Sequence, residues 1–178
     1  LGIRSDGQNN ALLNLSVSGA AISSAAGSSG AANLLVRGCR VCHANYRSSN
    51  NNWDWYSGNT GSGFGLDGVN IHLRDCESFH NWNCGGPGGR HIIAENYHVH
   101  GAPNHGWLIG GSCNVLVVNM KEYNCQDGFY ISNVRNLVLE HCTAFGGFGL
   151  QDYTHDTGWG LGGLTVRNCI FMDGLAFV

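Results

Sequence analysis

The sequence predicts an all-β solenoid, in which short strands stack turn upon turn along one axis. Three observations support this prediction. A segment with alternating apolar residues recurs at a nearly constant spacing, a second motif of glycine followed by a large apolar residue recurs with it, and no stretch sustains the 3.6-residue period of a long helix. A short strand cannot bury its apolar face alone, so the copies must stack on one another.

The first repeat consists of six segments that align without gaps. Successive copies begin 21 to 27 residues apart, except for one step of 37, which gives a basic period of about 22 residues. The copies are NLLVRGC from Asn33, NIHLRDC from Asn70, HIIAENY from His91, NVLVVNM from Asn114, NLVLEHC from Asn136 and GLTVRNC from Gly163.

Each position of this repeat has a predicted environment. The second and fourth positions are apolar, as in a strand with one buried face, and the fifth is mostly charged and should face solvent. The sixth position is Asn, Asp, Gly or His, and the first three of these tolerate the left-handed backbone of a tight corner. The seventh position, often Cys, should turn inward again.

The second repeat, seen in SGFGLD, HGWLIG, DGFYIS and TGWGLG, predicts a further strand in each turn. Alternation places the first large apolar residue of each copy, and the residue two positions later, in the core. The first residues of these pairs are Phe64, Trp107, Phe129, Phe148 and Trp159. The residue between the two members of each pair should face solvent. These residues are Gly65, Leu108, Tyr130, Gly149 and Gly160.

Together, the strands of the type N-h-x-h-x-N-C (h, apolar), the asparagine corner and the inward Cys and aromatic residues resemble the right-handed parallel β-helix of the pectate-lyase-like superfamily. The resemblance implies a single-stranded, open-ended β-helix domain of about seven rungs over residues 1–178, with loop inserts at about 43–62 and 151–158. It implies little about activity, because this fold carries lyases, hydrolases, epimerases, tailspikes and adhesins.

Composition excludes some function classes and favours one location. Nine basic residues are scattered along the chain, whereas nucleic-acid binding needs clustered Lys and Arg, and no apolar run is long enough to span a bilayer. Eight cysteines indicate an extracellular or cell-surface protein, although buried thiols would give the same count. Either Cys39–Cys76 and Cys142–Cys169 form disulfides between adjacent rungs, or these residues stay thiols packed in the core.

Catalytic residues are predicted only if the protein is a polysaccharide lyase or glycoside hydrolase. The carboxylate motifs usual in polygalacturonases and calcium-dependent pectate lyases do not occur here, so no residue is carried over from them. The best remaining group is Asp152, His155 and Asp156 in QDYTHDTG, because an Asp beside a His can orient its proton transfer. The alternative is an ordinary solvated loop.

The insert at 43–62 is the predicted carbohydrate-binding segment. It carries Trp53, Asp54, Trp55 and Tyr56, and a flat ring can pack on a sugar face while polar neighbours bond its hydroxyls. The same loop could instead fold over an outer sheet or bury its tryptophans against another subunit.

Two further groups have less specific patterns. Arg37 and Arg74 should lie on adjacent rungs, where they could bind a carboxylated sugar or join a ladder of opposite charges with Glu95 and Glu140. His98 and His100 share one face of a strand, but two imidazoles with no third ligand do not define a metal site. We therefore predict no metal and no cofactor.

The chain begins and ends within its own repeat, as LGIRSD and DGLAFV, without a capping segment. The protein is thus predicted either to be a slice of a longer β-helix or to associate head to tail through its chain ends. The preferred function is an extracellular structural β-solenoid, a fibre, spike or surface-filament element, with carbohydrate binding as an additional role. The alternative is an enzyme of the pectate-lyase-like fold.

Overall fold

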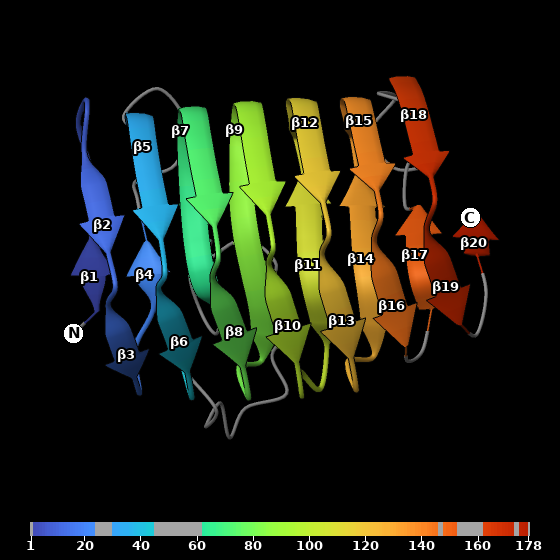
Figure 1. Ribbon diagram of the computed structural model, residues 1–178, viewed down its shortest axis with the longest axis horizontal. Helices are drawn as coiled ribbons and strands as arrows, with labels where there is room; N and C mark the ends of the chain where they lie inside the picture. Colours follow the sequence, from blue (N-terminus) through green and yellow to red (C-terminus); the bar gives the residue numbers. More distant parts are fainter. Residues whose placement is uncertain are drawn as a thin grey trace.

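The protein is an all-β parallel solenoid, so the predicted fold class is confirmed. The computed structural model describes residues 2–23, 30–44, 62–145, 148–152, 162–172 and 175–177, and these contain strands and turns but no helix. Among these residues there is accordingly no helix that could cross a membrane. Figure 1 shows the strands stacked side by side, with β1 and β20 at opposite ends of the stack.

Three parallel sheets form the sides of the solenoid, and we name them A, B and C. Sheet A contains β2 (Ala11–Leu13), β5 (Ala31–Arg37), β7 (Ser62–Arg74), β9 (Asn83–Glu95), β12 (Cys113–Val118), β15 (Arg135–Glu140) and β18 (Gly162–Arg167), and β1 (Ile3–Arg4) and β4 (Ile22–Ser23) join it through β7.

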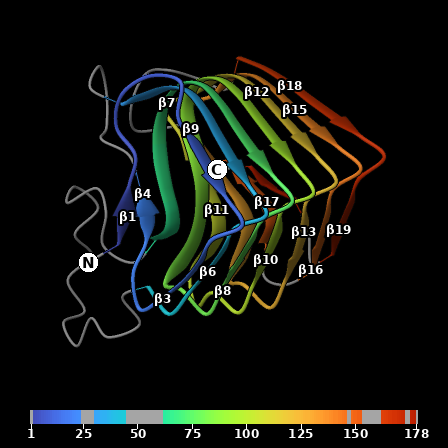
Figure 2. The ribbon, with the colours of Figure 1, turned by 60° about the vertical axis from the view of Figure 1, so that its left-hand side comes forward.

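Sheet B follows sheet A in each turn, and sheet C completes the later turns, from β11 onward. Sheet B contains β3 (Ser16–Ser18), β6 (Arg40–Cys42), β8 (Glu77–Phe79), β10 (His98–His100), β13 (Lys121–Tyr123), β16 (Thr143–Phe145) and β19 (Ile170–Met172). Sheet C contains β11 (His105–Gly110), β14 (Asp127–Ser132), β17 (Phe148–Asp152) and β20 (Leu175–Phe177). In Figure 2, β12, β15 and β18 of sheet A lie side by side and point in the same direction.

The register in sheet A matches the repeat. Equivalent residues of successive copies are direct neighbours, as in Leu34 with Ile71 and Val115 with Leu137. About five turns are well formed, somewhat fewer than the expected seven rungs, because β1 to β4 are only two or three residues long.

The core consists of the predicted inward columns. In β5, β7, β9, β12 and β15 the residues at the second and fourth positions are at most 1% exposed. The exceptions are in β18, where Leu164 is partly buried and Val166 is 42% exposed, because no described strand of sheet A covers their far side. Burying such columns of Leu, Ile and Val is the main favourable contribution to the stability of the stack.

The corner between sheets A and B has the predicted left-handed backbone in every copy. The φ angle at the sixth position is 52° at Asp75 and Asn96, 53° at Asn119 and Asn168, and 64° at Gly38. A single residue in this conformation turns the chain sharply, so only two residues separate the end of each sheet A strand from the start of the next sheet B strand.

The seventh position contains thiols that bond to this corner. Cys39, Cys76, Cys142 and Cys169 each donate through Sγ to the carbonyl oxygen two residues earlier, over 3.1 to 3.4 Å. All eight cysteines of the chain are thiols in the structure, which corresponds to the second of the two predicted states. Burial raises the pKa of Cys76 to about 12, which suppresses formation of the reactive thiolate.

Sheet C partly departs from the prediction. Trp107, Ile109, Phe129 and Ile131 are fully buried as expected, whereas Tyr130, predicted to face solvent, is buried although it alternates with inward neighbours. The outer side of β14 is therefore covered near this residue. Gln151 and Asp152, predicted to begin a loop, instead belong to β17.

Candidate functional site

The outer face of sheet B is the most exposed apolar surface in the described part of the chain. The middle residue of each three-residue strand points into the core, so the first and third residues line the outside. The third positions of four successive strands form what we name the aromatic column: Phe79, His100, Tyr123 and Phe145. The first positions of the earlier strands form the charged column: Arg40, Glu77, His98 and Lys121.

Stacking orders the first three rings of the aromatic column. The rings of Phe79 and His100 lie 5.1 Å apart at 9°, and those of His100 and Tyr123 lie 4.6 Å apart at 4°. These separations follow from the spacing of parallel strands, which places equivalent side chains about 4.8 Å apart. The rings are thus held in fixed orientations on the surface.

Ion pairs fix the first half of the charged column. Glu77 contacts Arg40 over 2.6 Å and His100 over 3.1 Å, and the Arg40 guanidinium lies 5.5 Å from the centre of the Phe79 ring. Partial burial raises the pKa of Glu77, but the hydrogen bonds from His100 and Arg40 outweigh it and the net pKa is lowered. Glu77 is therefore ionised at neutral pH and locks the two columns together.

The second half of the face is exposed to solvent. Tyr123 and Phe145 are 48% and 46% exposed, and Ile170 and Met172 of β19 are more than 45% exposed. Lys121, two residues before Tyr123 on the same face, forms no ion pair within the described ranges. Exposed rings next to a hydrogen-bonding cation form a surface that can hold the C–H face and the polar groups of a sugar.

A second group lies on the outer side of sheet C and was not predicted. His105 Nδ1 is 2.7 Å from Asp127 Oδ2, and the Tyr130 ring lies 4.4 Å from the His105 ring. Their side chains are nearly covered, with 5% of His105 and 3% of Asp127 exposed. Asn83 supports the group, because its Oδ1 accepts hydrogen bonds from His105 N and Asn104 Nδ2.

Strict alternation is the reason that sequence reasoning missed this pair. A Cβ on Gly106 would lie 3.1 Å from Glu122 Cγ and 3.2 Å from Val99 Cγ2, and both side chains are inward. Gly106 and Trp107 therefore both face the core, which moves His105 to the outer side. The available signal was the spacing, since His105 and Asp127 occupy the same place in adjacent turns.

The structure does not test the predicted binding and catalytic residues, because it describes only Asp152 among them. Trp53, Asp54, Trp55 and Tyr56 lie outside the described residues, and so do His155 and Asp156. Asp152 is the last residue of β17 and pairs with Ile131. Along its strand it is thus about 13 Å from the level of Asp127.

Two further predictions concern Arg37 with Arg74 and a metal site. Arg37 and Arg74 are neighbours as predicted, and both lie within 3.6 Å of Asp75, while Arg74 also contacts Glu95 over 3.7 Å. They form a ladder of opposite charges. In the described ranges no group of three or more His, Cys, Asp or Glu side chains is placed to hold a metal ion.

Comparison with known proteins supports the fold. Neither a family model nor a curated protein matches the chain. Among solved structures, the crystal structure of the periplasmic alginate epimerase AlgG matches with a TM-score of 0.52 and 11% sequence identity. The match covers 95% of this chain and 44% of the epimerase chain, so the chain spans less than half of that protein's length.

At this identity the likeness shows a shared β-solenoid fold. Membership of the pectate-lyase-like superfamily stays a prediction, because no family model supports it.

Proposed function

We propose that the chain is an extracellular β-solenoid that binds polysaccharide through the outer face of sheet B. The observation that carries the proposal is the exposed second half of the aromatic column, Tyr123 and Phe145, beside Lys121. Large exposed apolar patches on a stable surface mark interaction sites. The solenoid neighbour, a periplasmic alginate epimerase, gives a carbohydrate-related precedent for the fold.

The chemistry of the face favours a polymer with carboxylate groups. Lys121 and Tyr123 are two residues apart on one side of a strand, a separation of about 7 Å, so one sugar unit can contact both. A pyranose packs its C–H face against the ring while its carboxylate pairs with the ammonium group. The next turn repeats the ring at Phe145, so a chain crossing the strands meets a second ring.

The test is binding of alginate, a polyuronate, and hydroxyethyl cellulose, a neutral polymer, by affinity electrophoresis. The Tyr123→Ala, Phe145→Ala double variant should weaken alginate binding at least tenfold, whereas Thr165→Ala on the exposed face of sheet A should not change it. Lys121→Ala should weaken alginate binding mainly at low salt. Equal binding by the double variant, or no binding by the unmodified chain, rejects this surface.

A second candidate function is catalysis on the same class of polymer, and the His105–Asp127 pair favours it. Asp127 orients the imidazole through Nδ1, and the other ring nitrogen would take the proton from the carbon next to a uronate carboxylate. Tyr130 would supply a proton from its hydroxyl. Because the pair is covered, catalysis requires the outer side of sheet C to open to the polymer.

This candidate predicts turnover that depends on His105. Incubation of polyuronates in D₂O should give deuterium incorporation or an unsaturated product, detected by NMR, and His105→Ala should abolish it. His98→Ala on sheet B is the matched histidine control. If no polyuronate reacts, the catalytic role is rejected, and the His105–Asp127 hydrogen bond serves only to link β11 and β14.

A filament role through head-to-tail association is a separate proposal that the sequence suggests. Electron microscopy of the purified protein should then show uniform fibres a few nanometres wide. Discrete particles at all concentrations would reject the filament role and leave polysaccharide binding unaffected.

A further inference from the structure

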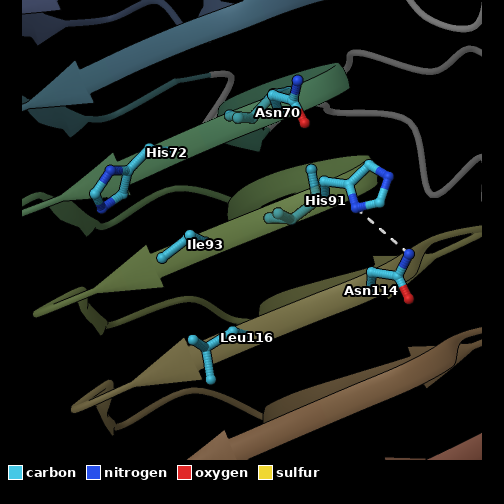
Figure 3. A pocket seen from close by; sticks show the side chains of 8 residues that line it. Asn70, His72, His91, Ile93, Asn114 and Leu116 are labelled. Atoms are coloured by element: carbon cyan, nitrogen blue, oxygen red, sulfur yellow. Dashed lines mark hydrogen bonds between the residues drawn. The ribbon is translucent and has the colours of Figure 1, made fainter.

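The outer face of sheet A has a hollow of about 420 Å³ that crosses three turns. Asn70 and His72 of β7, His91 and Ile93 of β9, and Asn114 and Leu116 of β12 surround it, as Figure 3 shows. Ile71 and Ile92, which alternate with these residues along β7 and β9, also line the hollow. Its volume is within the range of small-molecule sites.

The hollow lies where a ladder of asparagine side chains is interrupted. Along the first repeat position each amide donates to the preceding turn: Asn33 to Asn9, Asn70 to Asn33 and Asn136 to Asn114, all over 2.9 Å. His91 takes the place of an asparagine, and its Nδ1 is 3.4 Å from Asn114 Nδ2. Within the described ranges, no hydrogen bond joins His91 to Asn70.

The interruption leaves hydrogen-bonding atoms at the rim. Because His91 Nδ1 accepts from the Asn114 amide, its proton is on Nε2, which can donate to a ligand. Asn70 Oδ1 receives no donor from the next turn and can accept. Across the hollow, His72 Nε2 is 3.0 Å from Glu95 Oε2, so His72 presents Nδ1 as an acceptor when neutral.

The inner surface between these polar atoms is aliphatic. Ile93 and Leu116 are the outward residues of adjacent strands, and both face the hollow in Figure 3. The lining includes no Lys, Arg, Asp or Glu, and Glu95 beside it is already paired with His72 and Arg74. A charged ligand would therefore find no opposite fixed charge.

We propose that this hollow binds one uncharged pyranose unit of a saccharide. A pyranose has an apolar C–H face for Ile93 and Leu116, and hydroxyls that both donate and accept, which matches the mixed rim. The break in the ladder is the structural argument, because replacing a repeated asparagine sacrifices a regular hydrogen bond and such exceptions mark functional positions. This inference is independent of the sheet B proposal.

The experiment is a titration of the full chain with cellohexaose, mannohexaose and laminarihexaose, followed by amide NMR and calorimetry. At least one neutral hexasaccharide should shift amides of β7, β9 and β12 with saturation. Hexagalacturonate should bind the hollow at least fivefold more weakly. Shifts confined to β13 and β16, or no shifts with any of the three, would overturn the proposal.

His91→Asn is the decisive variant, because it restores the ladder and asparagine accepts the φ of 57° found at this position. It should keep or raise the melting temperature and weaken saccharide binding at least fivefold. Asn33→His is the control: it places an imidazole one turn outside the hollow, with Nδ1 able to accept from Asn70, and should not change the affinity. Unchanged affinity in His91→Asn would refute the site.

Tyr123→Ala separates the two proposals. It should leave binding in the hollow unchanged even where it abolishes alginate binding on sheet B. Ile93→Ser gives a second test of the hollow that leaves its rim intact, and it should weaken the neutral saccharide through lost apolar contact.

Discussion

At the residue scale, the most unusual position is Glu122, a carboxyl group inside the solenoid. It is the middle residue of β13 and is fully buried, where the equivalent residues of neighbouring strands are Val99 and Ala144. Its Oε1 accepts from Cys125 N over 2.9 Å, whereas Oε2 has no hydrogen-bond partner in the described part of the chain. Burial raises the pKa of Glu122, hydrogen bonds at its carboxyl group lower it, and the charge of Asp127 raises it; the net pKa is about 7.

This shift predicts a protein that is less stable in alkali than in mild acid. Unfolding returns the pKa of Glu122 to about 4.5, so between these values the folded state binds more protons and stability falls as pH rises. Well above pH 7, the free energy of unfolding is lowered by the full cost of ionising the buried carboxyl group. Glu122→Gln removes this cost, and it should stabilise the fold by about 3 kcal/mol at pH 8 and by much less at pH 4.5.

Urea unfolding of both proteins at the two pH values measures the difference. Thr165→Ala on the exposed face of sheet A is the control, because it removes no ionisable group and should change stability equally at both pH values. A Glu122→Gln effect of equal size at both pH values would show that packing, and not ionisation, is responsible.

At the element scale, the corner between sheets A and B determines how the strands connect. Asn119 has a φ of 53°, its N–H donates to the Glu140 carbonyl oxygen over 2.9 Å, and its side chain donates to Asn96 Oδ1 over 2.8 Å. The same residue thus satisfies the backbone, adopts the unusual φ and links two turns. Asparagine at this position is favoured for all three reasons.

Substitutions at Asn119 should separate these contributions. Asn119→Gly loses only the side-chain bond, at a cost of about 1 kcal/mol. Asn119→Ala also forces a Cβ-bearing residue without local hydrogen bonds into the left-handed region, so it should cost about 1 kcal/mol more. Thermal unfolding should rank the variants in the order Asn, Gly, Ala, and equal effects of Gly and Ala would exclude backbone strain as a cause.

The repeat made the strands and corners predictable, because period-two alternation and left-handed residues act locally. Leu34 and Ile71 are buried neighbours as their alignment predicts, and so are Val115 and Leu137. His105 could not be placed in this way, since Gly106 and Trp107 both face inward and shift the alternation by one residue. Nor does alternation say what covers an outer face, which is why the burial of Tyr130 was missed.

The hollow on sheet A illustrates the same limit between elements. The sequence shows that His91 replaces an asparagine in the repeat, but not that the replacement breaks a hydrogen-bonded ladder. That consequence depends on the direction in which each amide donates, from one turn to the preceding turn, and only the assembled stack defines it.

At the scale of the whole molecule, the stack is a one-dimensional array in which each turn packs only on its neighbours. Its stability is therefore a sum of turn and interface contributions, and the position of a residue along the stack matters as much as its type. Leu137 and Leu164 test this directly, because they occupy the same repeat position and are paired to each other in β15 and β18.

Leu137 is fully buried between the turns of β12 and β18, whereas Leu164 is only partly buried in the last strand of sheet A. Leu137→Ala should destabilise the fold by about 2–5 kcal/mol, since it opens a cavity with walls on both sides. Leu164→Ala should cost about 1 kcal/mol, because its site is already open on one side. Denaturant unfolding of the two variants compares them.

The same pair also tests where the stack begins to unfold. If turns act as coupled units, Leu164→Ala should accelerate amide hydrogen exchange in β18 and β19 with little change in β9 and β12, while Leu137→Ala should accelerate exchange on both sides of β15. Equal costs and uniform exchange in both variants would instead mean that the solenoid unfolds as a single cooperative unit, with no gradient of stability along its axis.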